Sequence, residues 1–200
     1  MKLYYIYKAF RRIFLEIAAI TDKIRTCIIF WGNNVHHHDF TANGTPYMMV
    51  SNGGKCSIGH HFAMNNKLSG GAVRRCNFFV GNGAELTIGD HVGISATTIG
   101  ACKKVAIGNH VVLGTGVCIF DSDFHSLDPN VRAFDSEDTK KATKKVIIED
   151  HAFIGAYSII LKGVTIGKNS IVGAGSVVRN SIPPNQIWAG NPAKFVIEIF

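Results

Sequence analysis

The chain has 200 residues, 46% of them hydrophobic, which is enough for one apolar core and too apolar for general disorder. It has no run of 18 or more uncharged apolar residues, so no membrane-spanning helix is expected. Its apolar, basic N-terminus lacks the small-residue cleavage site of a secretory signal. The net charge of +7 indicates an anionic partner, and nucleic acid, an acidic membrane surface and a polyphosphate cofactor all qualify.

Residues 1–31 have the apolar spacing of an amphipathic helix, with a largely basic opposite face. The apolar positions are Leu3, Ile6, Tyr7, Phe10, Ile13, Phe14, Ile17, Ile20, Ile24, Cys27, Ile28 and Trp31, and the basic ones are Lys2, Lys8, Arg11, Arg12, Lys23 and Arg25. Two interpretations stand. The helix holds the protein at an anionic membrane surface, or it packs on the rest of the chain or on a neighbouring subunit.

Three adjacent histidines, His36, His37 and His38, follow this helix. Adjacent residues on an extended strand point to opposite faces, so all three can hardly meet one ion. We therefore predict no metal site. The five cysteines are odd in number, widely spaced and without a C-x-x-C pair, which favours reduced thiols in a cytoplasmic protein.

The second half of the chain contains a six-residue repeat, in which every sixth residue is β-branched and apolar. The repeat reads Ile148, Ile154, Ile160, Ile166, Val172 and Val178, with mostly small residues four positions later. The same phase occurs upstream at Ile88, Ile94, Ile107, Leu113 and Ile119, and more weakly at Ile58 and Met64. Three such repeats close one triangular coil, so residues 18 apart should stack, Ile148 on Ile166 for example.

The corners of such coils need small residues or residues that accept positive φ. Three positions after the inward residues come His61, His91, His110, Gly116, His151, Gly163, Asn169 and Gly175. Gly, Asn and His are enriched in the left-handed region of φ/ψ space. We therefore interpret His61, His91, His110 and His151 as corner residues without a chemical role.

One segment, residues 120–145, interrupts the repeat and is rich in Asp, Ser and Lys. A long insertion in a regular solenoid is usually a functional loop. The expected organisation is a helix over 1–31, an all-β parallel β-helix over 32–196 with this inserted loop, and a tail over 197–200.

The repeat, the loop around Phe120-Asp121-Ser122-Asp123-Phe124-His125 and the closing Gly190-Asn191-Pro192-Ala193-Lys194 resemble the hexapeptide acetyltransferases. The match covers roughly residues 47–196, and its branch looks like the maltose, galactoside and nodulation-factor sugar O-acetyltransferases and their polysaccharide-cluster relatives. The resemblance implies a left-handed β-helix, although parallel crossovers are otherwise right-handed. It also implies a homotrimer with active sites between subunits, and acetyl-CoA as co-substrate.

By that resemblance, His125 is the general base that deprotonates the acceptor hydroxyl. Asp121, Asp123, Asp128 or a backbone carbonyl could orient its ring, and we also place Asp123 among the residues that bind the acceptor. The sugar branch carries an asparagine for the acceptor or oxyanion at a position that falls near Ile94 or Ser95 in this chain, which has no asparagine there. Ser95 could donate a hydrogen bond in its place or have a structural use alone, which leaves the acceptor and the oxyanion partner open.

The resemblance places the pantetheine arm of CoA against small residues of the last coils, at Ala156 and Ala174. The CoA phosphates would then meet Arg179, Asn180 and Lys194. Coil packing for the alanines and solvated surface charge for the basic residues are the alternatives. Trp188 either covers the adenine or caps the open core.

The predicted function is therefore acetyl transfer from acetyl-CoA to a hydroxyl of a sugar or polysaccharide precursor, without metal and without a nucleic-acid partner. A xenobiotic or amino-sugar N-acetyltransferase of the same fold and a non-catalytic β-helix binding module are the alternatives. The gamma class of carbonic anhydrase shares the fold but uses histidines of neighbouring coils as zinc ligands, whereas the coil histidines here sit at predicted corners.

Overall fold

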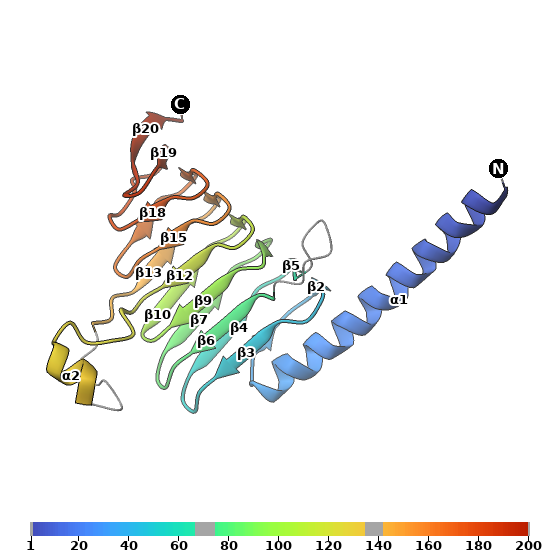
Figure 1. Ribbon diagram of the computed structural model, residues 1–200, viewed down its shortest axis with the longest axis horizontal. Coiled ribbons are helices and arrows are strands. Elements are labelled where there is room, and N and C mark those ends of the chain that lie inside the picture. Colours follow the sequence, from blue (N-terminus) through green and yellow to red (C-terminus); the bar gives the residue numbers. More distant parts are fainter. Residues whose placement is uncertain (1, 67–74, 135–141, 200) are drawn as a thin grey trace.

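The computed structural model of the chain describes residues 2–66, 75–134 and 142–199. A long helix, α1 (Lys2–Gly32), leads into a stack of triangular coils that rises to the C-terminus (Figure 1). Short parallel strands form the three sides of each coil, and equivalent strands of successive coils pair into three sheets. The fold is a left-handed parallel β-helix, as predicted.

Each sheet contains one side of every coil. Sheet A consists of β1 (His36–His37), β4 (Lys55–Ile58), β7 (Glu85–Ile88), β10 (Lys104–Ile107), β13 (Val146–Ile148) and β16 (Thr165–Ile166). Sheet B consists of β2 (Phe40–Asn43), β5 (Phe62–Asn65), β8 (Gly93–Ser95), β11 (Val112–Leu113), β14 (Phe153–Ile154), β17 (Ile171–Val172), β19 (Gln186–Ala189) and β20 (Lys194–Glu198). Sheet C consists of β3 (Tyr47–Val50), β6 (Asn77–Val80), β9 (Thr98–Ala101), β12 (Cys118–Phe120), β15 (Ile159–Ile160) and β18 (Val177–Val178).

The register of these strands confirms the predicted stacking. Ile148 pairs with Ile166, Ile154 with Val172 and Ile160 with Val178. All six side chains are buried, as are the upstream members of the repeat, so one continuous apolar column fills the interior of the prism. A single coil could not bury this face alone, so the column depends on the array.

The chain passes from sheet A to B, from B to C and from C back to A in every coil, and we call the turns between them the A–B, B–C and C–A corners. The predicted positive φ occurs at every corner residue named from the sequence, including all four histidines and Asn169. The histidines and Asn169 form the A–B corner of successive coils. Glycines take the same conformation at the other two corners, for example Gly116 and Gly163.

The irregular step of thirteen residues between Ile94 and Ile107 has two parts. Ile99 of β9 occupies the position between them, so a step of five is followed by a step of eight. The additional residues lie at the C–A corner between Ile99 and Ile107. The register of the stack is kept on both sides of it.

The ends of the stack differ. Phe30 of α1 is buried under the first coil, beside Val35 and Phe40. At the other end β19 joins sheet B and β20 folds back on it antiparallel, running through Glu198 into the segment expected as a tail. A short helix, α2 (Pro129–Phe134), protrudes from the loop at the C–A corner (Figure 1). Residues 135–141 of that predicted loop lie outside the described residues.

Candidate active site

The predicted catalytic loop is anchored at its first residue. Asp121 is fully buried directly after β12, and its carboxylate accepts hydrogen bonds from the backbone N–H groups of Cys102, Lys103 and Lys104, each at 2.7 Å. These three N–H groups belong to the C–A corner one coil earlier. Because a buried carboxylate is stable only when its oxygens are hydrogen-bonded, Asp121 fixes where the loop begins.

His125 is exposed at a sharp bend of this loop. Phe124, just before it, has a φ of +61° and donates its backbone N–H to Ser122 Oγ at 2.9 Å. The ring of Phe124 meets that of Phe120 edge-on, with centroids 5.3 Å apart. Both rings pack over Gly100 of β9, where a Cβ would lie only 3.0 Å from Phe124. Phe124 therefore lies against the coil while His125 remains open to solvent.

The residues after His125 are held by the start of α2. Asp128 caps this helix by accepting the N–H of Asn130 at 2.9 Å, and proline at the next position suits the first helical residue. Arg132 of the same helix donates from Nη1 to the carbonyl of Ser126 at 2.8 Å. His125 thus lies between two anchored turns. The hexapeptide rule did not predict α2, although the Asp128-Pro129 pair is a helix-start signal.

Asp123 forms an ion pair with Lys162, the residue before the corner Gly163 of the next coil, and both side chains are half-buried. Lys162 was missed by the sequence analysis, because no motif connects it to the loop. Of the three carboxylates proposed to orient the imidazole, Asp121 binds backbone amides, Asp123 binds Lys162 and Asp128 caps α2. All three therefore contribute to the structure of the loop itself.

Three of the predicted CoA-binding residues follow one edge of the prism. Ala156 and Ala174 lie at the B–C corners of neighbouring coils, where Gly175 N–H donates to the carbonyl of Ala156 at 2.8 Å. The approach is so close that a Cβ on Gly155 would lie 2.5 Å from the backbone nitrogen of Ala174. The two alanines are stacked as expected, and Ala174 is exposed.

Lys194 continues this edge toward the C-terminus. It starts β20 opposite Ala189, and the turn before it is fastened to the last coil, where Gly190 accepts from Val177 N–H and donates to Ser176 Oγ, both at 3.0 Å. The side chain of Lys194 is exposed. Small side chains next to an exposed ammonium group form a surface on which a narrow arm ending in phosphates could lie.

The remaining predicted residues lie elsewhere. Arg179 and Asn180 are exposed after β18, at the C–A corner from which the His125 loop also leaves, two coils further along. Ser95 ends β8 at the B–C corner of an earlier coil, on the same edge of the prism as the two alanines, and lines a shallow hollow beside Ala19 of α1. The candidate residues of one chain are thus divided between two corners of the prism.

Trp188 is half-buried and donates from Nε1 to Gln186 Oε1 at 2.8 Å. It pairs in register with Val172 and packs against the apolar column. Its position supports the capping interpretation, because its ring lies at the open end of the core.

The coil histidines form a ladder along the A–B corner. The rings of His61, His91, His110 and His151 succeed one another with centroids 4.5, 4.7 and 4.8 Å apart. Their positive φ places them there, in agreement with the prediction that they are corner residues.

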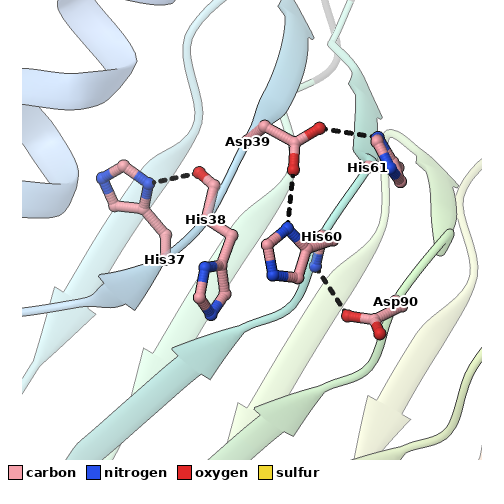
Figure 2. A network of polar contacts seen from close by, with 6 residues as sticks. All are labelled: His37, His38, Asp39, His60, His61 and Asp90. Carbon is pink, nitrogen blue, oxygen red and sulfur yellow. Dashed lines mark hydrogen bonds and ion pairs between the residues drawn. The ribbon is translucent and has the colours of Figure 1, made fainter.

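At the base of the ladder, His60 and His61 of the second coil meet Asp39 of the first coil (Figure 2). Nδ1 of His60 and of His61 lie 3.0 and 2.7 Å from its two carboxylate oxygens, and the ring of His38 stacks on His60 at 3.8 Å. Desolvation raises the pKa of Asp39, but the hydrogen bonds to His60 and His61 outweigh it and lower that pKa overall. No group of three or more His, Cys, Asp or Glu side chains within the described residues is arranged to hold a metal ion.

Comparison with known proteins agrees with this architecture. Residues 145–180 match the family described as bacterial transferase hexapeptide (six repeats). A galactoside O-acetyltransferase of Lactococcus lactis is 42% identical over 88 residues, which are 44% of this chain and 40% of that protein. The chain therefore spans less than half the length of this curated relative.

Two solved structures share the fold. AntD, an N-acyltransferase from Bacillus cereus solved with dTDP and 3-hydroxybutyryl-CoA, superposes with a TM-score of 0.65 at 20% identity, covering 86% of each chain. The hexapeptide-repeat acetyltransferase VCA0836 of Vibrio cholerae gives 0.54 at 22% identity, covering 100% of this chain and 94% of the other. The chain thus contains the hexapeptide repeat over residues 145–180, and it is similar in part of its sequence to a galactoside O-acetyltransferase and in fold to these two acyltransferases.

Proposed function

We propose that the protein is an acetyl-CoA-dependent acyltransferase that acetylates a hydroxyl of a sugar or polysaccharide precursor. The observation that carries the proposal is the placement of His125. It is an exposed imidazole on a loop fixed by Asp121, by the Asp123–Lys162 ion pair and by α2, on a prism whose other edge is lined by small residues and Lys194.

The chemistry assigns one role to each group. His125 removes the proton of the acceptor hydroxyl as the oxygen attacks the thioester carbonyl, because an uncharged hydroxyl is a poor nucleophile. The carbon–sulfur bond breaks, the acetyl group stays on the oxygen as an ester, and the protonated imidazole returns the proton to the departing thiolate. Ala156 and Ala174 flank the pantetheine arm, and Lys194 binds a phosphate of CoA.

The division of the residues between two corners supports a site shared by two copies of the chain. His125, Arg179 and Asn180 lie along the C–A corner, whereas Ser95, Ala156, Ala174 and Lys194 lie along the B–C side. If three prisms associate side by side, the C–A corner of one can face the B–C edge of the next. We therefore propose a homotrimer, in which Ser95 and Asp123 are near the acceptor and Arg179 with Asn180 supplements the CoA site.

The cysteines support a cytoplasmic location. Cys27, Cys56, Cys76, Cys102 and Cys118 are all reduced thiols, and such thiols persist where the environment is reducing.

Transfer to an amine is the second candidate, and the similarity to AntD, an N-acyltransferase, favours it. The two products differ chemically. An acetyl ester is cleaved by mild alkali and by hydroxylamine, whereas an acetamide survives both. Galactosides and oligosaccharides, each compared with an amino sugar, should therefore be offered as acceptors, and the alkali lability of the labelled product measured.

The base is tested by His125→Ala, with His36→Ala as the matched control at another exposed histidine. We expect turnover, followed as release of the CoA thiol, to fall by about a hundredfold to ten-thousandfold for His125→Ala. Affinity for CoA should stay nearly unchanged, and His36→Ala should retain full activity. An unchanged rate for His125→Ala would exclude the general-base role, and a purified protein that binds no CoA would favour the non-catalytic binding module.

A further inference from the structure

The apolar stripe of α1 faces away from the β-helix. We define the apolar stripe as the following eleven residues, all of them between 51% and 85% exposed: Leu3, Ile6, Tyr7, Phe10, Ile13, Phe14, Ile17, Ile20, Ile24, Ile28 and Trp31. At 100° per residue they occupy an arc of roughly 140° along the whole helix. Single exposed apolar residues are ordinary, but a continuous stripe of this size marks a contact surface.

The contact of α1 with its own coils uses the opposite side of the helix. Asp22, Thr26 and Phe30, spaced four apart, are buried there. Asp22 Oδ2 accepts the N–H of Gly44 at 2.8 Å, and Phe30 packs against Phe40 with ring centroids 5.2 Å apart. The helix is thus fastened by its last turns, and its N-terminal part extends away from the coils (Figure 1). A flat surface could therefore cover the whole stripe without meeting the β-helix.

The charges of α1 indicate what that surface is. Five basic side chains of the helix are exposed: Lys8, Arg11, Arg12, Lys23 and Arg25. The helix exposes one carboxylate, Glu16, which is already paired with Arg12 at 3.1 Å. Its other acidic residue, Asp22, is buried. Arg11 and Arg25 follow one margin of the stripe on the helical wheel. Beyond the other margin lie Glu16, then Lys23 and Arg12. Such a helix lies in the plane of an anionic lipid surface, with its apolar face inserted.

A second copy of α1 fits these charges poorly. Paired helices are favoured by opposite charges beside their apolar seam, and the α1 helix offers five exposed cations against the single exposed carboxylate of Glu16, which Arg12 already pairs. Anionic headgroups supply the missing charge, at a gain of about fivefold in affinity for each basic residue near the surface. No helix of the described chain is both long and apolar enough to cross a membrane.

We propose that α1 is an interfacial membrane helix that holds the β-helix at an anionic lipid surface through its apolar stripe. The proposal is independent of the acyl transfer proposed above, because it uses none of the residues of that site.

Flotation of the full chain with phosphatidylcholine vesicles, with and without phosphatidylglycerol, tests it. We expect binding only to the anionic vesicles, weakening as salt is added. Ile17→Asn, on the stripe, should lower the vesicle partition coefficient by about tenfold or more, from the apolar burial it removes. Leu15→Asn is the matched control, since Leu15 is 50% exposed against 58% for Ile17 but lies on the opposite side of the helix.

Two double variants that each remove two positive charges, and the fluorescence of Trp31, complete the test. Arg11→Gln with Arg25→Gln should reduce binding by about 25-fold. Lys103→Gln with Lys168→Gln, exposed lysines of the coils, should leave it unchanged. The emission of Trp31 should shift to the blue on binding, and the shift should be absent from Trp31→Phe, which retains Trp188.

Two results would overturn the proposal. One is equal or absent binding to the two kinds of vesicle. The other is that Ile17→Asn has a lower molecular mass than the parent chain by sedimentation but binds vesicles equally well. That result would mean that the stripe contacts a second copy of the chain.

Discussion

The coils and α1 both have a periodic pattern of apolar residues, yet only the coils bury these residues. Every sixth residue of the repeat points into the prism, and Ile160, for example, is completely buried. In α1 the pattern has the helical period, and its members, such as Ile24, remain more than half exposed. Periodicity predicts which residues share a face, but it does not say whether the molecule covers that face with its own atoms.

The difference has a structural cause. A triangular coil encloses its inner face, and each new coil covers the one before it. A single helix has no inside, so its apolar stripe is covered only by what lies next to it. In α1 the coils take the side that holds Asp22, Thr26 and Phe30 and leave the stripe uncovered.

The largest effect expected from this contrast concerns unfolding. Ile160→Ala removes a buried side chain from the column and should lower the free energy of unfolding by about 2–5 kcal/mol. The matched change in the helix, Ile24→Ala, should stay within about 0.5 kcal/mol of the parent chain. Chemical denaturation followed by circular dichroism measures both. Similar losses for the two variants would mean that the stripe is covered in solution without any lipid.

Thiol reactivity gives a second and smaller contrast. Burial raises the pKa of Cys76, inside the coils, to about 11 from an ordinary 9.0. The difference of two pKa units leaves about a hundredfold less thiolate at a given pH below 9. We expect iodoacetamide to label Cys27 of α1, which is half-buried, well before Cys76. Mass spectrometry of the alkylated native chain would read this order, and early labelling of Cys76 would contradict the closed core.

The smallest effect is expected where the two regions join. The pKa of Asp39 is lowered in the folded chain, so its contribution to stability is present above its unfolded value near 3.8 and is lost as pH falls through the folded value. Asp39→Asn should therefore be slightly less stable than the parent chain at neutral pH, and this difference should disappear as the pH falls below about 4. Thermal unfolding across this pH range, compared with the parent chain, would measure it. If the stability of Asp39→Asn fell with pH as steeply as that of the parent chain, the contact of Asp39 with His60 and His61 would have no such role.

Much of the candidate site could be predicted because it follows from local rules. The hexapeptide phase stacked Ala156 and Ala174 in neighbouring coils, and the interruption of that phase located the loop with His125. Lys162 could not be predicted, because its partner Asp123 is 39 positions away and meets it only when the coils stack. The same holds for Asp121, whose three amide donors belong to the preceding coil.

The sequence by itself determined the repeat, the inward residues, the positive-φ corners and the amphipathic character of the first thirty residues, because each depends on side-chain periodicity and local backbone preference. The tertiary structure decided which side of α1 meets the coils, how the loop of His125 is anchored, and that the candidate residues occupy two different corners. These features depend on contacts between residues far apart in the chain, which exist only after the coils have closed on one another.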